Sequence, residues 1–271
     1  MNIDDIRNIE IGFPETNRYF EQTSIDGYAF LGIARHILGQ DTTDVEKKME
    51  NMKYGLNAPH RIRETNLPPD EPYVYSCFSA YMFYDAIGRT DKIEDIVDTL
   101  DKIGKYDNGM MRYCNTEINY IIPNVTPLAA LVYQGVKRYH DAKQLLSALK
   151  NNQNDNGNWS YSIPCKNILP QEEDSTHLCM MTYAIDNITN PIADSIISRT
   201  LPCIFSMNND KISPGSIGWG YPWLTMVSKW WPEMQSKAIE LTIQEMLNPE
   251  SNFRVRALSK WALAFIEVTE Q

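Results

Sequence analysis

The chain has 271 residues, of which 43% are hydrophobic, and its formal net charge is -10. This length and apolar content suffice for a full hydrophobic core, and no linker or low-complexity tract divides the chain, so we expect one domain over residues 1–271. The acidic balance argues against nucleic acid and anionic membrane surfaces as partners, because both attract clustered Lys and Arg. The chain has no apolar run of about eighteen residues, which excludes an integral membrane helix.

The N-terminal residues 1–15 are acidic and lack the basic and apolar regions of a signal peptide. Five cysteines occur, an odd number without a CxxC pair, which favours reduced thiols over a disulfide framework. We therefore expect a cytoplasmic protein. The four histidines lack the spacing of a zinc site, so no metal or cofactor is expected.

Similar apolar segments recur about every fifty residues along the chain. They begin at Asp26, Ser76, Thr126 and Thr176, and each of these residues can cap a helix. Apolar or aromatic residues follow at matched positions, Tyr28, Phe78, Leu128 and Leu178 and then Ile33, Phe83, Tyr133 and Tyr183. Because these segments are apolar on nearly all sides, we interpret them as inner helices surrounded by others.

More charged, amphipathic patterns lie between the inner helices. We predict outer helices over 44–54, 91–105, 141–152, 191–207 and 232–247, each ending near Gly or Asn residues that suit a helix C-cap. Two further inner helices are expected over 221–231 and 254–268. The sequence therefore predicts an all-α protein, an α/α toroid of five to six helical hairpins, with an open α-solenoid of the same hairpins as the alternative.

One motif carries a resemblance to a known superfamily. Residues 153–159, QNDNGNW, fit the spacing Gln-x-x-x-Gly-x-Trp, which resembles the QW repeat of squalene and terpene cyclases, whose protein prenyltransferase relatives share the toroid. In that superfamily the Gln stacks on the Trp and ties an outer helix to the next hairpin. The resemblance implies the same structural role for Gln153 and Trp159. A glycine C-cap beside a core Trp would explain the pattern equally simply.

The acidic segment 172–176, EEDST, is similar to the Asp-x-Asp-Asp-Thr motif of class II terpene cyclases, in which the middle Asp protonates an alkene or epoxide. The resemblance implies that Asp174 is the catalytic acid and that Glu172 flanks it, whereas Ser175 departs from the motif. The alternative role is structural, because Asp174 or Ser175 would also cap the following helix and Glu172 would favour its positive end.

The chain is rich in aromatic residues on the inner helices and their entry loops. An aromatic-lined cavity would suit a carbocation or a sugar ring. For substrate binding we select Tyr133, Tyr183, Trp219, Trp223 and His177.

The leading hypothesis is thus a terpene cyclase-like protein, an isomerase or lyase of class II, that acts on a hydrophobic isoprenoid chain. Magnesium would be expected only for a diphosphate substrate. Family members usually build the cavity between two helical domains, so a homodimer or a second helical subunit is an expected partner. Two alternatives remain: a carbohydrate-active toroid with acid/base carboxylates drawn from Glu172, Glu173, Asp174 and Asp107, and a non-catalytic recognition module with a filled ring centre.

Overall fold

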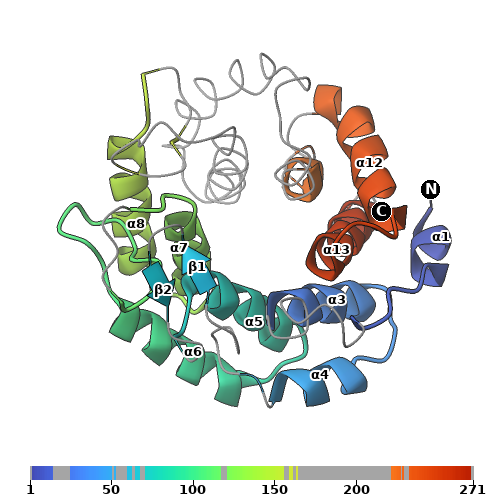
Figure 1. Cartoon of the computed structure of the whole chain (residues 1–271), viewed down its shortest axis with the longest axis horizontal. Helices are drawn as coiled ribbons and strands as arrows, with labels where there is room; N and C mark the ends of the chain where they lie inside the picture. Colours follow the sequence, from blue (N-terminus) through green and yellow to red (C-terminus); the bar gives the residue numbers. More distant parts are fainter. Residues whose placement is uncertain are drawn as a thin grey trace.

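The protein is described by a computed structural model. The residues it describes are 2–14, 25–50, 52, 60–62, 65–67, 71–116, 121–155, 159–160, 163, 221–226, 228 and 232–269. Within them, helices alternate along the chain between an inner and an outer position around a ring (Figure 1). The fold is an all-α α/α toroid.

The inner helices are the apolar segments of the sequence repeat. They are α3 (Ile25–Ile37), α5 (Val74–Ala86), α7 (Val125–Gly135) and α13 (Phe253–Thr269), together with a short helix over 221–226. The repeat positions Tyr28, Phe78 and Leu128 are all buried, as predicted, whereas Leu178 lies outside the described residues. These helices are covered on all sides because they pack both on each other and on an outer helix.

The outer helices are α4 (Thr43–Glu50), α6 (Thr90–Ile103), α8 (Tyr139–Asn151) and α12 (Pro232–Leu247). In α6, Ile96, Leu100 and Ile103 form a buried stripe, while Glu94 and Asp98 are exposed. This division follows the helical spacing of the apolar residues, so an outer helix buries one face and leaves the other in water.

The ring closes where its first and last inner helices meet. Helix α13 packs against α3, and Figure 1 shows the two side by side although they lie at opposite ends of the chain. This contact decides between the two predicted architectures, because an open solenoid would leave its first and last hairpins apart. We call the α3/α13 contact the ring seam. A short N-terminal helix, α1 (Ile3–Asn8), packs on α13 outside it.

The predicted helix caps are wrong. Asp26, Ser76 and Thr126 all lie within the first turn of their helices, one to two residues past the helix start. Helices α5 and α7 begin after Tyr73 and Asn124, neither of which forms a side-chain capping bond. Instead, the Thr126 hydroxyl accepts a hydrogen bond from the backbone N–H of Met111 in the preceding loop, at 3.2 Å. At α5 a loop carbonyl takes the place of a cap, because the Val74 N–H at the helix start donates to Tyr113 at 3.1 Å.

One small sheet was not predicted. Strands β1 (His60–Ile62) and β2 (Thr65–Leu67) form an antiparallel hairpin in the connection between α4 and α5. Of the five cysteines, Cys77 and Cys114 lie in the described part of the chain, and both are buried free thiols. No helix among the described residues is long and apolar enough to cross a membrane.

Candidate functional site

Neighbouring inner helices run in the same direction. A Cβ on Gly27, near the start of α3, would meet Phe253 at the start of α13, and a Cβ on Gly135, at the end of α7, would meet Tyr81 in the second half of α5. The contacts between these helices therefore pair start with start and end with end. The inner helices α3, α5, α7 and α13 thus begin on one face of the ring, which we call the mouth.

Connection lengths also single out the mouth. The chain returns from an inner to an outer helix through the short segments 38–42, 87–89 and 136–138. It enters α5 and α7 through the much longer segments 51–73 and 104–124. Long connections on a rigid scaffold are where binding residues usually lie. The mouth is therefore the candidate functional face.

Five aromatic rings contact one another inside the ring. We call Phe30, Tyr75, Phe78, Trp223 and Trp261 the axial aromatic cluster. Phe30 stacks on Trp261 with ring centroids 5.4 Å apart and meets Trp223 edge to face at 6.3 Å. Trp223 also contacts Trp261 at 5.9 Å and, across the axis, Phe78 of α5 at 6.3 Å. Tyr75 meets Phe30 edge to face at 6.4 Å and is the half-buried member nearest the start of α5.

A buried ion pair lies toward the mouth from this cluster. The Arg254 guanidinium donates to the Asp26 carboxylate across the ring seam, and their side chains are 15% and 3% exposed. Asp26 precedes Phe30 by four residues and so shares its face of α3. The positive ends of α3 and α13 also favour the carboxylate there.

The charge of Asp26 also acts on Cys77 of the neighbouring inner helix α5. Burial, and after it the charge of Asp26, raises the pKa of the Cys77 thiol on α5 well above its ordinary value. Cys77 therefore stays a neutral thiol.

The long loop 104–124 forms a rim beside α5. Val74 donates its backbone N–H to the carbonyl of Tyr113 at 3.1 Å, and the Tyr73 and Tyr113 rings meet edge to face at 5.1 Å. The Glu71 carboxylate accepts the backbone N–H of Thr116 at 2.7 Å. Burial, with the nearby Cys114 and Glu71, raises the pKa of Tyr73 above its ordinary value, so its hydroxyl stays protonated. The rim thus presents the half-buried Tyr113 ring, backed by the buried Tyr73, and a fixed carboxylate.

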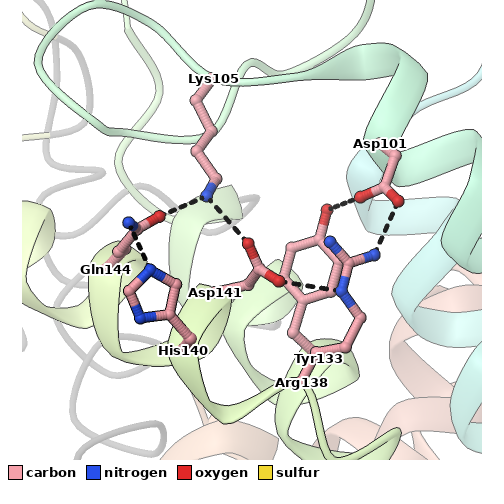
Figure 2. A network of polar contacts seen from close by, with 7 residues as sticks. All are labelled: Asp101, Lys105, Tyr133, Arg138, His140, Asp141 and Gln144. Carbon is pink, nitrogen blue, oxygen red and sulfur yellow. Dashed lines mark hydrogen bonds and ion pairs between the residues drawn. The ribbon is translucent and has the colours of Figure 1, made fainter.

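Two of the predicted substrate-binding residues fall within the described part of the chain. Trp223 belongs to the axial aromatic cluster. Tyr133 lies instead at the far end of α7, where its hydroxyl donates to Asp101 of α6 at 2.8 Å (Figure 2). Burial and this bond raise its pKa. Tyr133 therefore joins two hairpins here, and its binding of a substrate stays a prediction.

Figure 2 shows the polar network around Tyr133. Arg138 lies over the tyrosine ring, 4.6 Å from its centroid, and bridges Asp101 at 2.6 Å and Asp141 at 2.9 Å. Lys105 completes the chain of contacts, 3.5 Å from Asp141. Two further members, Gln144 and His140, extend it along α8. Both oxygens of each carboxylate are used in holding α6, α7 and α8 together, which assigns the network a structural role.

The remaining predicted site residues lie outside the described residues. They are the catalytic candidates Asp174 and Glu172 and the binding candidates Tyr183, Trp219 and His177. Asp107, an acid/base candidate of the carbohydrate hypothesis, is exposed in the loop turn after α6. In the described part of the chain, no three His, Cys, Asp or Glu side chains are grouped closely enough to hold a metal ion.

Trp159 of the QW-like motif is fully buried, as predicted. Its indole N–H donates to the carbonyl of Leu149 in the last turns of α8, at 3.0 Å. The Trp therefore ties the chain after α8 back onto that outer helix. The stacking of the Gln153 side chain on this ring stays a prediction.

Sequence reasoning missed Asp26 and Arg254 as a pair, and missed Phe30, Tyr75 and Phe78 as site residues. One signal was available: Asp26 is the only charged residue in the first ten positions of the otherwise apolar helix α3. A lone acid in a surrounded helix requires a buried partner.

No known family model matches the sequence, and no curated protein matches it significantly. Similar solved structures do exist. A possible member of the GH105 family from Salmonella enterica serovar Paratyphi A superimposes with a TM-score of 0.65 and 8% identity, over 99% of this chain and 93% of that one. A family 76 glycoside hydrolase from a bovine Bacteroides thetaiotaomicron strain gives 0.61 and 11%, over 92% and 70%. At these identities the likeness establishes the toroid fold alone.

A type II terpene cyclase from Scytonema, in complex with geranylgeranyl dihydroxybenzoate, also aligns with this chain. It covers 91% of this chain and 68% of its own, with 12% identity and a TM-score of 0.47. We base no argument on a similarity at that level.

Proposed function

We propose that the protein is a carbohydrate-active α/α toroid of one domain that binds a saccharide at the mouth. The axial aromatic cluster carries this proposal, because it gathers aromatic rings inside the ring next to a polar mouth, with Tyr75 half-buried at its edge. A long prenyl chain needs a deep apolar cavity, whereas a sugar ring needs a shallow site with an aromatic face and fixed polar groups. Tyr75, Tyr113 and Glu71 supply such groups, and the glycoside hydrolase of family 76 shares the fold.

In this proposal the acid and base are drawn from Glu172, Glu173, Asp174 and Asp107, of which Asp107 lies within the described residues. Glycoside hydrolysis requires two carboxyl groups about 5 to 10 Å apart, one protonated and one ionised. Asp26 is unsuited to either role, because its buried carboxylate is already bonded to the Arg254 guanidinium. We accordingly assign Asp26 to holding the mouth together. The proposal includes a cytoplasmic location and no cofactor.

Binding of a saccharide panel tests the proposal. We expect titration calorimetry with neutral and uronate-containing oligosaccharides to detect binding by the wild type. Tyr75→Ala should weaken saccharide binding at least about tenfold, because it removes one stacking contact worth a few kcal/mol at most. Tyr139, which is 63% exposed on the outer helix α8, offers the control Tyr139→Ala, which should bind as the wild type does. Absence of binding to every saccharide would contradict the proposal, as would equal affinity of the Tyr75 variant.

A class II cyclase is the second candidate, with Asp174 as the acid, Glu172 beside it and an isoprenoid as the substrate. The buried, bonded Trp159 favours it, because a cyclase toroid would tie an outer helix down in this way. Incubation with prenyl diphosphates, with and without magnesium, and with squalene-like chains separates the candidates. Cyclised product from the wild type, abolished in Asp174→Asn, would establish the cyclase, and no product would remove it.

A further inference from the structure

The N-terminal residues 2–14 lie across the ring seam, and we call them the N-terminal strap. Ile6 and Ile11 are its two buried anchors. Arg7 donates through Nε to the carbonyl of Leu38 after α3, at 3.0 Å, and Gln40 donates back to the carbonyl of Arg7 at 2.9 Å. Most other strap residues are exposed or half-buried. The strap therefore rests on a few contacts, and its opening requires far less energy than unfolding the ring.

A lysine is buried under the strap. Lys260 of α13 is 2% exposed, and its Nζ donates to the strap carbonyl of Ile9 at 2.6 Å and to Gln40 Oε1 at 3.5 Å. The strap thus covers a charged amine that would be hydrated if the strap moved away. Burial of an ammonium group is unfavourable unless it is fully paired. Closing the strap therefore disfavours the protonated, charged form of Lys260.

The charges on each element around Lys260 decide how strong this effect is. Burial first, and then the charge of Arg35 on α3, lower the pKa of Lys260 against the opposing charge of Glu10 in the strap, to a net value of about 8 from 10.5. The Arg35 charge is itself partly balanced by Asp44 of α4, at 2.6 Å. Arg7, a cation of the strap itself, pairs with Asp4.

Helix α12 packs on α13 as well. The charged groups at the loop joining them are Arg256, bonded to the carbonyl of Met246, and Glu245, bonded to Ser251. The groups acting on Lys260 are thus those of α3 and the strap.

We propose that the N-terminal strap is a pH-sensitive closure of the ring, which opens as Lys260 takes up a proton. With the strap closed, Lys260 loses its proton above about pH 8, and the neutral amine still donates to Ile9. With the strap open, the amine is in water and holds its proton up to its ordinary pKa of 10.5. Opening therefore binds a proton between about pH 8 and pH 10.5, and the open form becomes more favourable as the pH falls through this range.

Hydrogen exchange of the strap measures this equilibrium. The amides of Ile6 and Ile9 are bonded within the strap, to the carbonyls of Asn2 and Ile6. Because a helix of this length is unstable alone, an open strap loses these bonds. With pKa values of about 8 closed and 10.5 open, linkage predicts that their protection factors, corrected for intrinsic exchange, rise about tenfold from pH 7 to pH 9.

Two lysine variants separate Lys260 from a general pH effect. Lys260→Met fills a similar volume without a charge and should make the protection independent of pH. Lys237→Met removes an exposed lysine of α12 and should leave the tenfold rise intact. A flat profile in the wild type would overturn the proposal, as would an equal rise in Lys260→Met.

A direct titration covers the case in which Lys260→Met does not fold. The Nζ resonance of Lys260 in the wild type should titrate near pH 8, and in Ile11→Ala, which weakens strap anchoring, it should move toward 10.5. Titration of Lys260 together with the exposed lysines of the wild type would overturn the proposal.

Discussion

At the scale of single residues, the turns that end the inner helices repeat one backbone conformation. Gly39, Gly88 and Lys137 follow α3, α5 and α7 at matched positions, with φ of 68°, 76° and 64°. In each turn the next backbone N–H bonds to a carbonyl five residues earlier, as in the 2.7 Å bond from Arg138 to Tyr133. Lys137 is the one non-glycine residue with positive φ in the described part of the chain.

Replacing Lys137 by Gly should stabilise the protein. A residue with a Cβ is strained in the left-handed conformation, and glycine removes this strain. The greater freedom of glycine in the unfolded chain offsets part of the effect, so the free energy of unfolding should rise by roughly 0.5 to 1 kcal/mol. The reverse change at the equivalent turn, Gly88→Ala, should destabilise by about 1 kcal/mol. Urea unfolding of both variants measures these values. A loss of stability in Lys137→Gly would mean that its side chain contributes more than the strain removes.

At the scale of elements, Trp159 fastens the chain after α8 to that helix. Trp159→Ala should lower the free energy of unfolding by roughly 3 to 5 kcal/mol, the usual cost of emptying a buried aromatic site. Trp159→Phe keeps most of the apolar volume but leaves the Leu149 carbonyl without its indole donor, so it should cost about 1 to 3 kcal/mol. Thermal unfolding of both variants is the measurement, and a neutral Ala variant would contradict the role assigned to this residue.

Helix positions could be predicted from the sequence because the helical spacing of apolar residues determines which face of a helix is buried. Helix α6 illustrates this, since its stripe of Ile96, Leu100 and Ile103 appears both in the sequence and in the core. Helix caps could not be predicted in the same way. Thr126 has the composition of a cap, but a loop N–H occupies its hydroxyl, and that loop docks only in the folded ring. Tertiary contacts thus override local preference at helix ends.

The candidate site was harder to predict than the helices. Trp223 was selected because its segment is rich in aromatic residues, and it does belong to the axial aromatic cluster. Tyr133 was selected by the same repeat and lies at the opposite end of its helix, because repeat position fixes burial but not which end of the ring a side chain reaches. Asp26 and Arg254 are 228 residues apart, so only closure of the ring makes them partners.

At the scale of the whole molecule, the ring is held closed at a single seam between its first and last inner helices. Apolar contacts supply most of the attraction there, including the close approach of Phe253 to Gly27 and the edge contact of Tyr28 with Phe253 at 5.2 Å. The Asp26 and Arg254 pair adds a directional constraint. A buried ion pair adds little net stability over apolar residues, but removal of one partner leaves a charge that only the intact seam had compensated.

A double-mutant cycle at the seam should therefore be strongly non-additive. Arg254→Met leaves the Asp26 carboxylate buried without its guanidinium and should cost about 3 to 5 kcal/mol of unfolding free energy. Asp26→Asn leaves the cation, which is more exposed, and should cost less. The double variant carries neither charge, so its loss should be smaller than the sum of the single losses by at least about 1 kcal/mol. Urea unfolding at constant pH gives all four values. Strict additivity would show that the two side chains stabilise the ring independently, and the seam would then depend on its apolar contacts alone.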